Sequence, residues 1–376
     1  MQNINDCKLV GKTKKITIQD VARHANVSVG TIDRVIHNRG KVSPAKREKV
    51  EEAIKELNFN PNLLARTLAL GNRFTICALI PSTPYPGHYW SIPTQGIDVA
   101  AAQFNDYGIV VEYYYYDLFD ETSFVKQAGN ILNASPHGVI MAPLFLQESK
   151  TFTEKLKKKK IPYIFIDADL PGGNSLSYIG PDVKRSAFIA GKLLNSVLPE
   201  NSEILIVNMV KGFENAAALR RIEDGFREYF QNKGLEKERP IQVLTISSTH
   251  KETVFRELTK FYIRNSSVKG VFVTNSKSFL VSEYHRQHEL DIRVVGYDLV
   301  EDNAHHLKTG GIDFIISQGP FQQGKRAIQT LFDYFVFKKE PEKIQHVPLD
   351  IIIYENLDFY ISFNRLFMNE TKDTIT

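Results

Sequence analysis

Residues 16–71 have the sequence ITIQDVARHANVSVGTIDRVIHNRGKVSPAKREKVEEAIKELNFNPNLLARTLALG, and this stretch decides the fold of the N-terminal part of the chain. A T-x-x-D capping pattern starts at Thr17, and apolar residues then recur at helical spacing, which predicts a first helix at about 18–25. The polar turn N-V-S follows, and its last residue, Ser28, can cap a second helix that runs to Ile36. Two short helices joined by a tight turn are therefore predicted.

A third helix is predicted to begin at Ser43 and Pro44, because serine is a frequent N-cap and proline is favoured at the first helical position. Its apolar residues share one face: Val50, Ala53, Ile54 and Leu57. Three helices can close one small all-α core over residues 16–60, as in a helix-turn-helix headpiece. From periodicity alone, a small helical cap or a dimerisation module is the alternative.

The outer face of the second helix is not needed for packing and can enter a DNA major groove. Its residues are Val29, Gly30, Asp33, Arg34 and His37. Arg34 is the candidate base reader, because a guanidinium group can hydrogen-bond guanine through two donors. Residues 11–73 hold thirteen Lys/Arg and six Asp/Glu, so a net charge of +7 is concentrated there in a chain whose total is +4. This end of the chain attracts polyanions.

The same stretch resembles the DNA-binding headpiece of the lactose-repressor and galactose-repressor (LacI/GalR) family. The resemblance rests on the motifs T-x-x-D-V-A, A-x-V-S, T-I-x-R-V, V-S-P-x-x-R-E-K-V and N-P-N-x-x-A-R-x-L. The residues that it implies for base reading are Val29, Gly30 and Arg34. Those that it implies at the phosphates and at the groove edge are Thr17, Ser28, Thr31, His37 and Lys41.

Two positions of the second helix depart from the family pattern. Gly30 has no side chain where a base-reading residue usually lies, and glycine inside a helix costs about 1 kcal/mol relative to alanine. Asp33 replaces a small hydroxyl residue, and its carboxylate repels phosphates unless it pairs with a nearby cation or accepts from a cytosine amino group. The operator preference of the family is therefore not transferred to this chain.

Residues 61–72 are predicted to be a hinge between the headpiece and the rest of the chain. They contain good helix formers, but so short a helix is marginal alone in water, so its folding can be conditional. The resemblance implies that two such helices pair in a dimer and that Leu68 enters the minor groove, flanked by Asn62, Ala65 and Arg66. The alternative is a plain tether with Leu68 packed against the core.

Residues 73–376 alternate short apolar runs with amphipathic stretches. The runs that predict strands are FTICALI, IVVEYYYY, GVIMAP, PYIFID, EILIVN, IQVLTI, GVFVT, IRVVGYD and DFIIS. Apolar strands separated by helices indicate an α/β domain with parallel sheets and helices on both faces. Because such sheets bind ligands beyond the carboxyl ends of their strands, those ends are the candidate ligand site.

Polar and aromatic residues gather after the predicted strands. They are His88, Tyr89, Trp90, Asp167, Asp169, Arg220, Arg221, Asn275, Asp298 and Gln318. Aromatic rings can stack on the apolar faces of sugars, while acids, amides and guanidinium groups can bind pairs of hydroxyls. Singly, Trp90 could be a core residue, Asp167 a helix cap and Arg220 part of a surface ion pair. Together these residues indicate a site for a sugar-sized ligand.

This second region is similar to periplasmic sugar-binding proteins, ribose binders especially, which also supply the effector domain of the LacI/GalR family. The similarity implies two lobes with a ligand cleft between them, in which Tyr89 and Trp90 sandwich a sugar. It implies ligand contacts for Asp167, Asn275, Asp298, Gln318 and either Arg220 or Arg221. Ser276 departs from the aspartate that often follows Asn275.

Other functional classes find little support in the sequence. It has no phosphate-loop, zinc-protease or nucleophile-elbow motif, so no catalytic residue, cofactor or metal is predicted. His305 and His306 are interpreted as surface residues. Residues 1–15 are polar and lysine-rich, which predicts a disordered lead-in and no secretory signal. Only two cysteines occur and no apolar run approaches a membrane span, so we expect a cytoplasmic protein.

The sequence thus predicts a homodimeric, cytoplasmic transcription regulator, a repressor of carbohydrate-use genes. We expect it to bind a pseudo-palindromic double-stranded DNA operator and to be controlled by a sugar-like effector that reorients the lobes and changes the hinge. Two alternatives come from other classes. A sugar-binding transport receptor would need an export signal, and a sugar-processing enzyme would need a catalytic dyad in the crevice.

Overall fold

The structure of the protein is a computed structural model that describes residues 18–36, 40, 42–57, 73–83, 88–170, 172–209 and 216–369. The chain divides into two compact units, Met1–Asn72 and Arg73–Thr376. Several residues singled out in the sequence lie outside the described residues: the lead-in 1–15, Thr17, His37, Lys41, Asn62, Ala65, Arg66 and Leu68.

The first unit contains the three predicted helices, α1 (Ile18–His24), α2 (Val29–Ile36) and α3 (Pro44–Glu56). Their inward residues form one core: Val21, Ala22, Ala25, Ile32, Val35, Val50 and Ala53. The backbone N–H of Thr31 donates to Ser28 Oγ at 3.3 Å, as expected of a cap. Ser43 is the N-cap residue of α3, as predicted, although its side chain accepts no capping hydrogen bond. Proline at the first position begins α3 instead.

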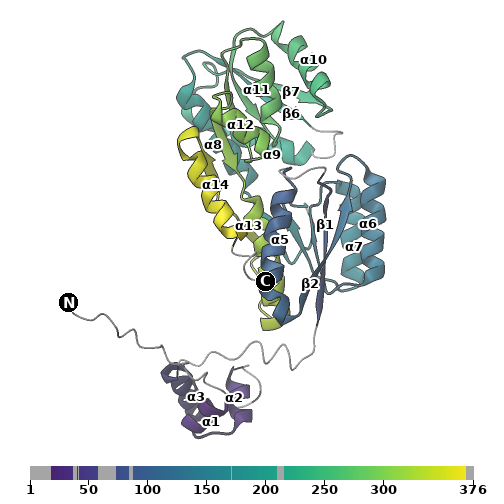
Figure 1. Cartoon of the computed structure of the whole chain (residues 1–376), viewed down its shortest axis with the longest axis vertical. Helices are drawn as coiled ribbons and strands as arrows, with labels where there is room; N and C mark the ends of the chain where they lie inside the picture. Colours follow the sequence, from purple (N-terminus) through teal and green to yellow (C-terminus); the bar gives the residue numbers. More distant parts are fainter. Residues whose placement is uncertain are drawn as a thin grey trace, which may run out of the picture. The chain divides into compact units, whose positions relative to one another are not determined.

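The first lobe of the second unit is a six-stranded sheet in the order β11-β5-β4-β3-β1-β2. Its strands are β1 (Phe74–Pro81), β2 (Ile109–Tyr116), β3 (Gly138–Met141), β4 (Tyr163–Ile166), β5 (Ser177–Gly180) and β11 (Ile344–His346). Helices α5 (Ser91–Phe104) and α13 (Pro320–Phe332) lie on one face, and α6 (Glu121–Ala134) and α7 (Leu146–Lys158) lie on the other (Figure 1). A 3-10 turn (Asn105–Tyr107) follows α5, and a π-helical turn (Asp333–Phe337) follows α13.

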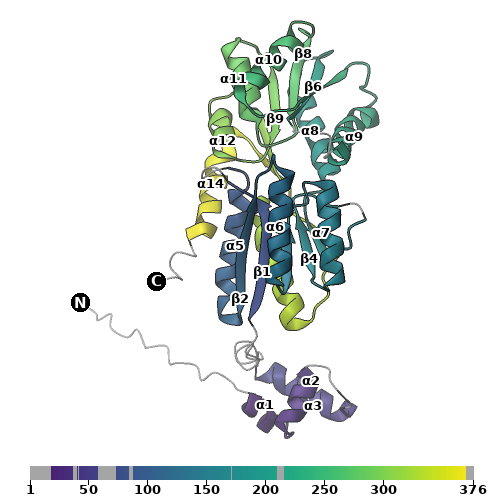
Figure 2. The same ribbon diagram turned by 90° about the vertical axis from the view of Figure 1, so that its right-hand side faces the viewer.

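The second lobe repeats this plan with the strand order β12-β10-β9-β8-β6-β7. Its strands are β6 (Glu203–Met209), β7 (Ile241–Ile246), β8 (Val268–Val273), β9 (Arg293–Tyr297), β10 (Phe314–Ser317) and β12 (Asp350–Ile352). Helices α8 (Val183–Val197) and α9 (Ala216–Lys233) cover one face, and α10 (Lys251–Tyr262), α11 (Ser278–Gln287), α12 (Glu301–Lys308) and α14 (Tyr354–Asn369) cover the other (Figure 2).

Within the described chain, three segments cross between the lobes: from β5 to α8, from β10 to α13, and from β11 to β12. The predicted parallel pairing is confirmed for the sheet pairs except β10 with β12, which is antiparallel. Since the strand orders match, β4 of the first lobe corresponds to β9 of the second. The residues that follow these two strands therefore occupy equivalent places, which positions the site described below.

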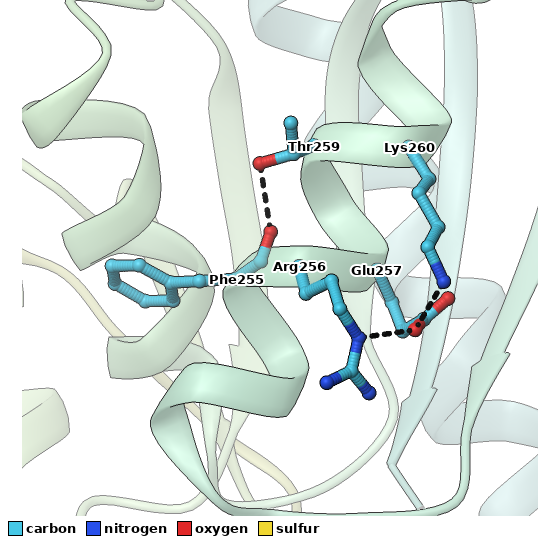
Figure 3. Close-up of polar contacts among 5 residues, drawn as sticks. All are labelled: Phe255, Arg256, Glu257, Thr259 and Lys260. Carbon is cyan, nitrogen blue, oxygen red and sulfur yellow. Dashed lines mark hydrogen bonds and ion pairs between the residues drawn. The ribbon is translucent and has the colours of Figure 1, made fainter.

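The outer surface of α10 is charged and solvated. Glu257 accepts hydrogen bonds from Lys260 at 2.9 Å and from Arg256 at 3.1 Å, and these two cations lower its pKa (Figure 3). Exposed ion pairs of this kind contribute little to stability. No helix among the described residues is long and apolar enough to cross a membrane.

The two adjacent histidines of α12 differ in their surroundings. His305 is exposed, but His306 is buried, and its Nδ1 atom lies 2.8 Å from the hydroxyl of Ser282 on α11. The expectation that both are surface residues is wrong for His306, because one face of α12 packs on α11 while the other faces water. His306 is part of a helix contact.

Candidate functional site

The second helix of the first unit presents a polar outer face. Ile32 and Val35 point into the core, whereas Val29, Gly30 and Arg34 are exposed. Val29 keeps 42% of its surface accessible, which is unusual for a valine in a packed helix. This separation follows from the helical period, since core and outer residues alternate every three or four positions. The described base-reading candidates therefore share one accessible face.

Hydroxyl groups mark the start of the same helix. Ser28 Oγ and Thr31 Oγ1 are 3.0 Å apart, and both lie at the N-terminal end of α2. Helix N-termini favour anions, because the first backbone N–H groups have no partner within the helix. Ser28 and Thr31, the two described candidates for phosphate contacts, thus lie at the end of the helix that favours anions.

In the second unit, the two predicted acids end equivalent strands in the same unusual backbone conformation. Asp167 follows β4 with φ 68°, and Asp298 follows β9 with φ 61°. A left-handed conformation is costly for residues other than glycine, and such strained positions gather at functional sites. The strain turns each acid sharply away from its strand at the carboxyl end.

Asp167 is held by residues of three other elements. The Tyr89 hydroxyl donates to Asp167 Oδ1, and the Asp167 backbone N–H donates to Gln323 Oε1 at 2.7 Å. The Tyr178 hydroxyl lies 3.0 Å from the carbonyl oxygen of Pro181 and 3.4 Å from that of Asp167. Burial raises the pKa of Asp167, while the hydrogen bond from Tyr89 lowers it. Burial also raises the pKa of Tyr89, so this hydroxyl stays protonated and acts as a donor.

Asp298 is only 2% exposed, and its carboxylate accepts two hydrogen bonds from Gln318. The backbone N–H of Gln318 donates to its Oδ1 atom at 3.0 Å, and the Gln318 side chain donates to Oδ2 at 3.1 Å. Burial, with a smaller contribution from the charge of Asp167, raises the pKa of Asp298 to about 7, while the hydrogen bonds from Gln318 oppose this rise. The acids of the two lobes are therefore close enough to interact electrostatically. Asp298 can therefore accept or donate hydrogen bonds near neutral pH.

The aromatic pair lies at the start of α5. The Tyr89 and Trp90 rings are 5.1 Å apart and nearly perpendicular, at 87°, so they pack edge to face. Both rings are buried. Neighbouring His88 is half-buried, and its pKa is lowered by burial and by the Lys277 cation of the other lobe. Lys277 was not singled out in the sequence, because one lysine after a strand carries no distinguishing pattern.

The three further candidates, Asn275, Arg220 and Arg221, have different surroundings. Asn275 donates to the Met209 carbonyl at 2.8 Å and accepts from the Lys277 backbone N–H at 3.1 Å, so its amide holds the end of β8 in place. Arg220 and Arg221 are both exposed on α9. Burial, and to a smaller extent the charge of Asp167, raises the pKa of Tyr178, whereas the Arg221 cation lowers it.

Gln323 is a residue of this site that the sequence patterns did not indicate. It lies in the first turn of α13, is 1% exposed, and donates through Nε2 to the Gln318 carbonyl at 3.0 Å. A glutamine on an amphipathic helix is ordinarily a surface residue, so no local signal marks it.

A cavity of about 530 Å³ lies at the opposite end of the second-lobe sheet. Its lining includes Arg293, Lys308, Asp313 and Tyr354, and the first and third of these form a 3.1 Å ion pair. Arg293 starts β9, whereas Asp298 follows its last residue. The cavity is therefore remote from the two acids and from the ligand candidates that surround them.

Comparison with known families assigns both units. Residues 17–62 match the family described as bacterial regulatory proteins, lacI family. Residues 78–339 match the periplasmic binding protein domain. The two matches fall on the helical unit and on the two-lobed unit respectively.

Individual relatives extend over most of the chain. The HTH-type transcriptional regulator MalR of Streptococcus pneumoniae is 24% identical over 304 residues, which are 76% of this chain and 84% of that protein. A solved structure of a putative LacI transcriptional regulator from Bacteroides fragilis is 31% identical, with a TM-score of 0.72, and covers 77% of this chain and 100% of its own. The glucose-galactose binding protein GanP of Geobacillus stearothermophilus shares the fold. It is 17% identical, with a TM-score of 0.66, and the match covers 76% of this chain and 99% of that protein.

Proposed function

Since the chain belongs to the lacI family of bacterial regulatory proteins and carries a periplasmic binding protein domain, we propose that it is a repressor controlled by a sugar-like effector. It is a DNA-binding transcription regulator by family. The genes that it controls serve carbohydrate use. The effector binds between the lobes, beyond the strand ends that carry Asp167 and Asp298.

One observation carries the choice of effector: Asp167 and Asp298, acids of opposite lobes, interact electrostatically, and Tyr89, which packs against Trp90, donates a hydrogen bond to Asp167. Each acid has a raised pKa, so each can exchange hydrogen bonds with hydroxyl groups. An anionic ligand would be repelled by the same carboxyl groups, whereas a neutral polyol would not. The Tyr89 and Trp90 rings are 8% and 4% exposed and pack edge to face, so a sugar ring beside them would contact only a small part of their apolar surface. A neutral sugar or polyol fits this arrangement best.

DNA is bound by a homodimer in the cytoplasm, with one α2 helix in each half-site of a pseudo-palindromic operator. The exposed face with Val29 and Arg34 supports this role. We propose no catalytic residue, cofactor or metal. The named relatives are regulators, which supports a role without catalysis.

The effector acts on DNA binding through the hinge at residues 61–72. Effector binding changes the relative positions of the lobes and so the spacing of the two hinge segments, which decides whether the Leu68 helices form. Amide hydrogen exchange of residues 61–71 should therefore slow in the presence of operator DNA and respond to effector. Exchange that is insensitive to both would contradict the hinge mechanism.

A thermal-shift screen of the full chain tests the effector class. Neutral monosaccharides and polyols are compared with sugar phosphates and sugar acids, because only the neutral group is expected to stabilise the protein. A ligand at about 100 times its Kd should add about 2.7 kcal/mol to the free energy of unfolding. Asp298→Asn should lose this response, and Asp291→Asn, an exposed acid before β9, should keep it. Stabilisation by anionic sugars alone would reject the proposal.

A further inference from the structure

One unbroken chain of hydrogen bonds joins the acid-bearing turns of the two lobes. Gln323 Oε1 accepts from the Asp167 backbone N–H at 2.7 Å, and Gln323 Nε2 donates to the Gln318 carbonyl at 3.0 Å. Gln318 then donates twice to the carboxylate of Asp298, at 3.0 and 3.1 Å. At the far end, Tyr89 donates to the Asp167 carboxylate. The first-lobe acid is thus linked to the second-lobe acid through the Gln323 side chain and then through Gln318.

The place of Gln323 in the fold suits a linking role better than a ligand contact. Its side chain is 1% exposed, and both ends of its amide are engaged. It lies one turn beyond the β10-to-α13 crossing, so it belongs to the first lobe while it binds a carbonyl of the crossing segment. Water cannot readily replace a partner at such a buried position, so each of its hydrogen bonds matters.

We propose that Gln323 is a positioning residue that makes the acid turn of one lobe depend on the state of the other. When the turn at Asp167 changes conformation, its backbone N–H moves and the Gln323 side chain moves with it. The hydrogen bond from Gln323 to the Gln318 carbonyl, on the segment that crosses between the lobes, is then broken or kept. Gln318 also donates both hydrogen bonds to the Asp298 carboxylate, so a change in the position of Asp167 changes how firmly Asp298 is held. This coupling between the two acids is present in the protein without ligand. Its role in the response to an effector rests on the proposed function.

Amide hydrogen exchange of the full-length protein tests the coupling without any ligand. The probe is the Gln318 amide, which donates to Asp298 in the second lobe. Tyr89→Phe removes a hydrogen bond in the first lobe, and we expect the Gln318 amide to exchange about fivefold faster, the factor of one net hydrogen bond. In the Gln323→Met background, the Gln318 amide already exchanges fast, and Tyr89→Phe adds nothing.

Two further variants separate the hydrogen bonds and control for damage to α13. Gln323→Glu keeps an acceptor for the Asp167 amide but loses the donor to the Gln318 carbonyl. The Gln318 amide should therefore exchange faster than in the wild type, while the Asp167 amide should keep its wild-type rate. Gln322→Met changes the neighbouring, partly exposed glutamine and should leave both amides at wild-type rates. Gln323→Met and Gln323→Glu differ in charge, so one reports if the other fails to fold.

The results distinguish this inference from the proposed effector. The role of Gln323 is overturned if Tyr89→Phe speeds the exchange of the Gln318 amide equally in the wild type and in Gln323→Met. It is also overturned if Tyr89→Phe leaves this exchange rate unchanged in both. The expected dependence on Gln323, in a protein that no sugar stabilises, upholds the coupling and rejects the sugar effector.

Discussion

Gly96 of α5 and Gly324 of α13 meet where the two helices cross, and neither position has room for a side chain. A Cβ atom on Gly96 would lie 2.0 Å from the carbonyl oxygen of Phe321. A Cβ atom on Gly324 would lie 2.0 Å from the carbonyl oxygen of Pro93. This contact seats the first turn of α13, which carries Gln323, against the first turn of α5, which follows the aromatic pair. The crossing therefore fixes two parts of the candidate site together.

Gly96→Ala should destabilise the first lobe, because the new methyl group collides with helix backbone that cannot rotate away. Overpacking of this kind typically costs about 1–3 kcal/mol. Gly129→Ala is the matched control: Gly129 lies in α6, and no atom lies within 4 Å of its would-be Cβ. There the helix should gain up to about 1 kcal/mol. Urea denaturation followed by the fluorescence of Trp90, the single tryptophan, measures both, and equal effects would contradict the close crossing.

Tyr89→Phe should weaken binding of whichever ligand stabilises the protein. The hydroxyl orients the Asp167 carboxylate, and the loss of a hydrogen bond to a charged group is expected to lower affinity about tenfold. Tyr113→Phe is a matched control, since Tyr113 also donates to an aspartate, Asp98, but on the exposed side of α5. Isothermal titration calorimetry with both variants decides whether the effect belongs to Asp167 or to tyrosine loss in general.

The pH dependence of stability should carry the signature of Asp298. Burial raises its pKa from 3.8 to about 7 in the folded chain, so the folded state holds this proton more tightly than the unfolded state does. The stability that the neutral carboxyl contributes is full below pH 3.8 and is lost as pH rises to about 7. The advantage of Asp298→Asn over the wild type in unfolding free energy should therefore grow across this window and then level off.

Unfolding curves at several pH values between about 4 and 8 measure this difference. Asp291→Asn, at the other end of β9, controls for the loss of a carboxyl group from an exposed position. A constant offset between Asp298→Asn and the wild type would show that the Asp298 carboxyl has an ordinary pKa in the folded chain.

Parts of the fold could be predicted because they depend on local patterns. The three headpiece helices follow from apolar spacing, and Asp167 and Asp298 stand directly after long apolar runs. Strands β5, β11 and β12 were not predicted, since their sequences SYIG, IQH and DII contain no apolar run of the kind that marks the other strands. They are fixed by pairing with neighbouring strands.

The Gln323 contact could not be predicted for a different reason. Its partner Asp167 lies 156 residues away in the sequence, and the two meet only because the chain crosses between the lobes. Likewise, the burial of His306 depends on which face of α12 packs against α11. Such contacts are properties of the tertiary structure, and no short window of sequence contains them.

Arg34 should control the operator sequence that the protein prefers. The side chain is exposed on α2, in a helix whose other face packs in the core, so it can reach base edges in the major groove. A two-donor contact with guanine is worth about 1–3 kcal/mol of discrimination, and Arg34→Ala should lose this preference at one base pair of each half-site. Arg23→Ala, on the exposed surface of α1, should weaken binding little and leave the preference unchanged. Selection of sites from random DNA, followed by competition binding at fixed salt, measures both. If Arg34→Ala weakened all sequences equally, the arginine would be a phosphate contact, and base reading would have to rest on Val29 and its neighbours.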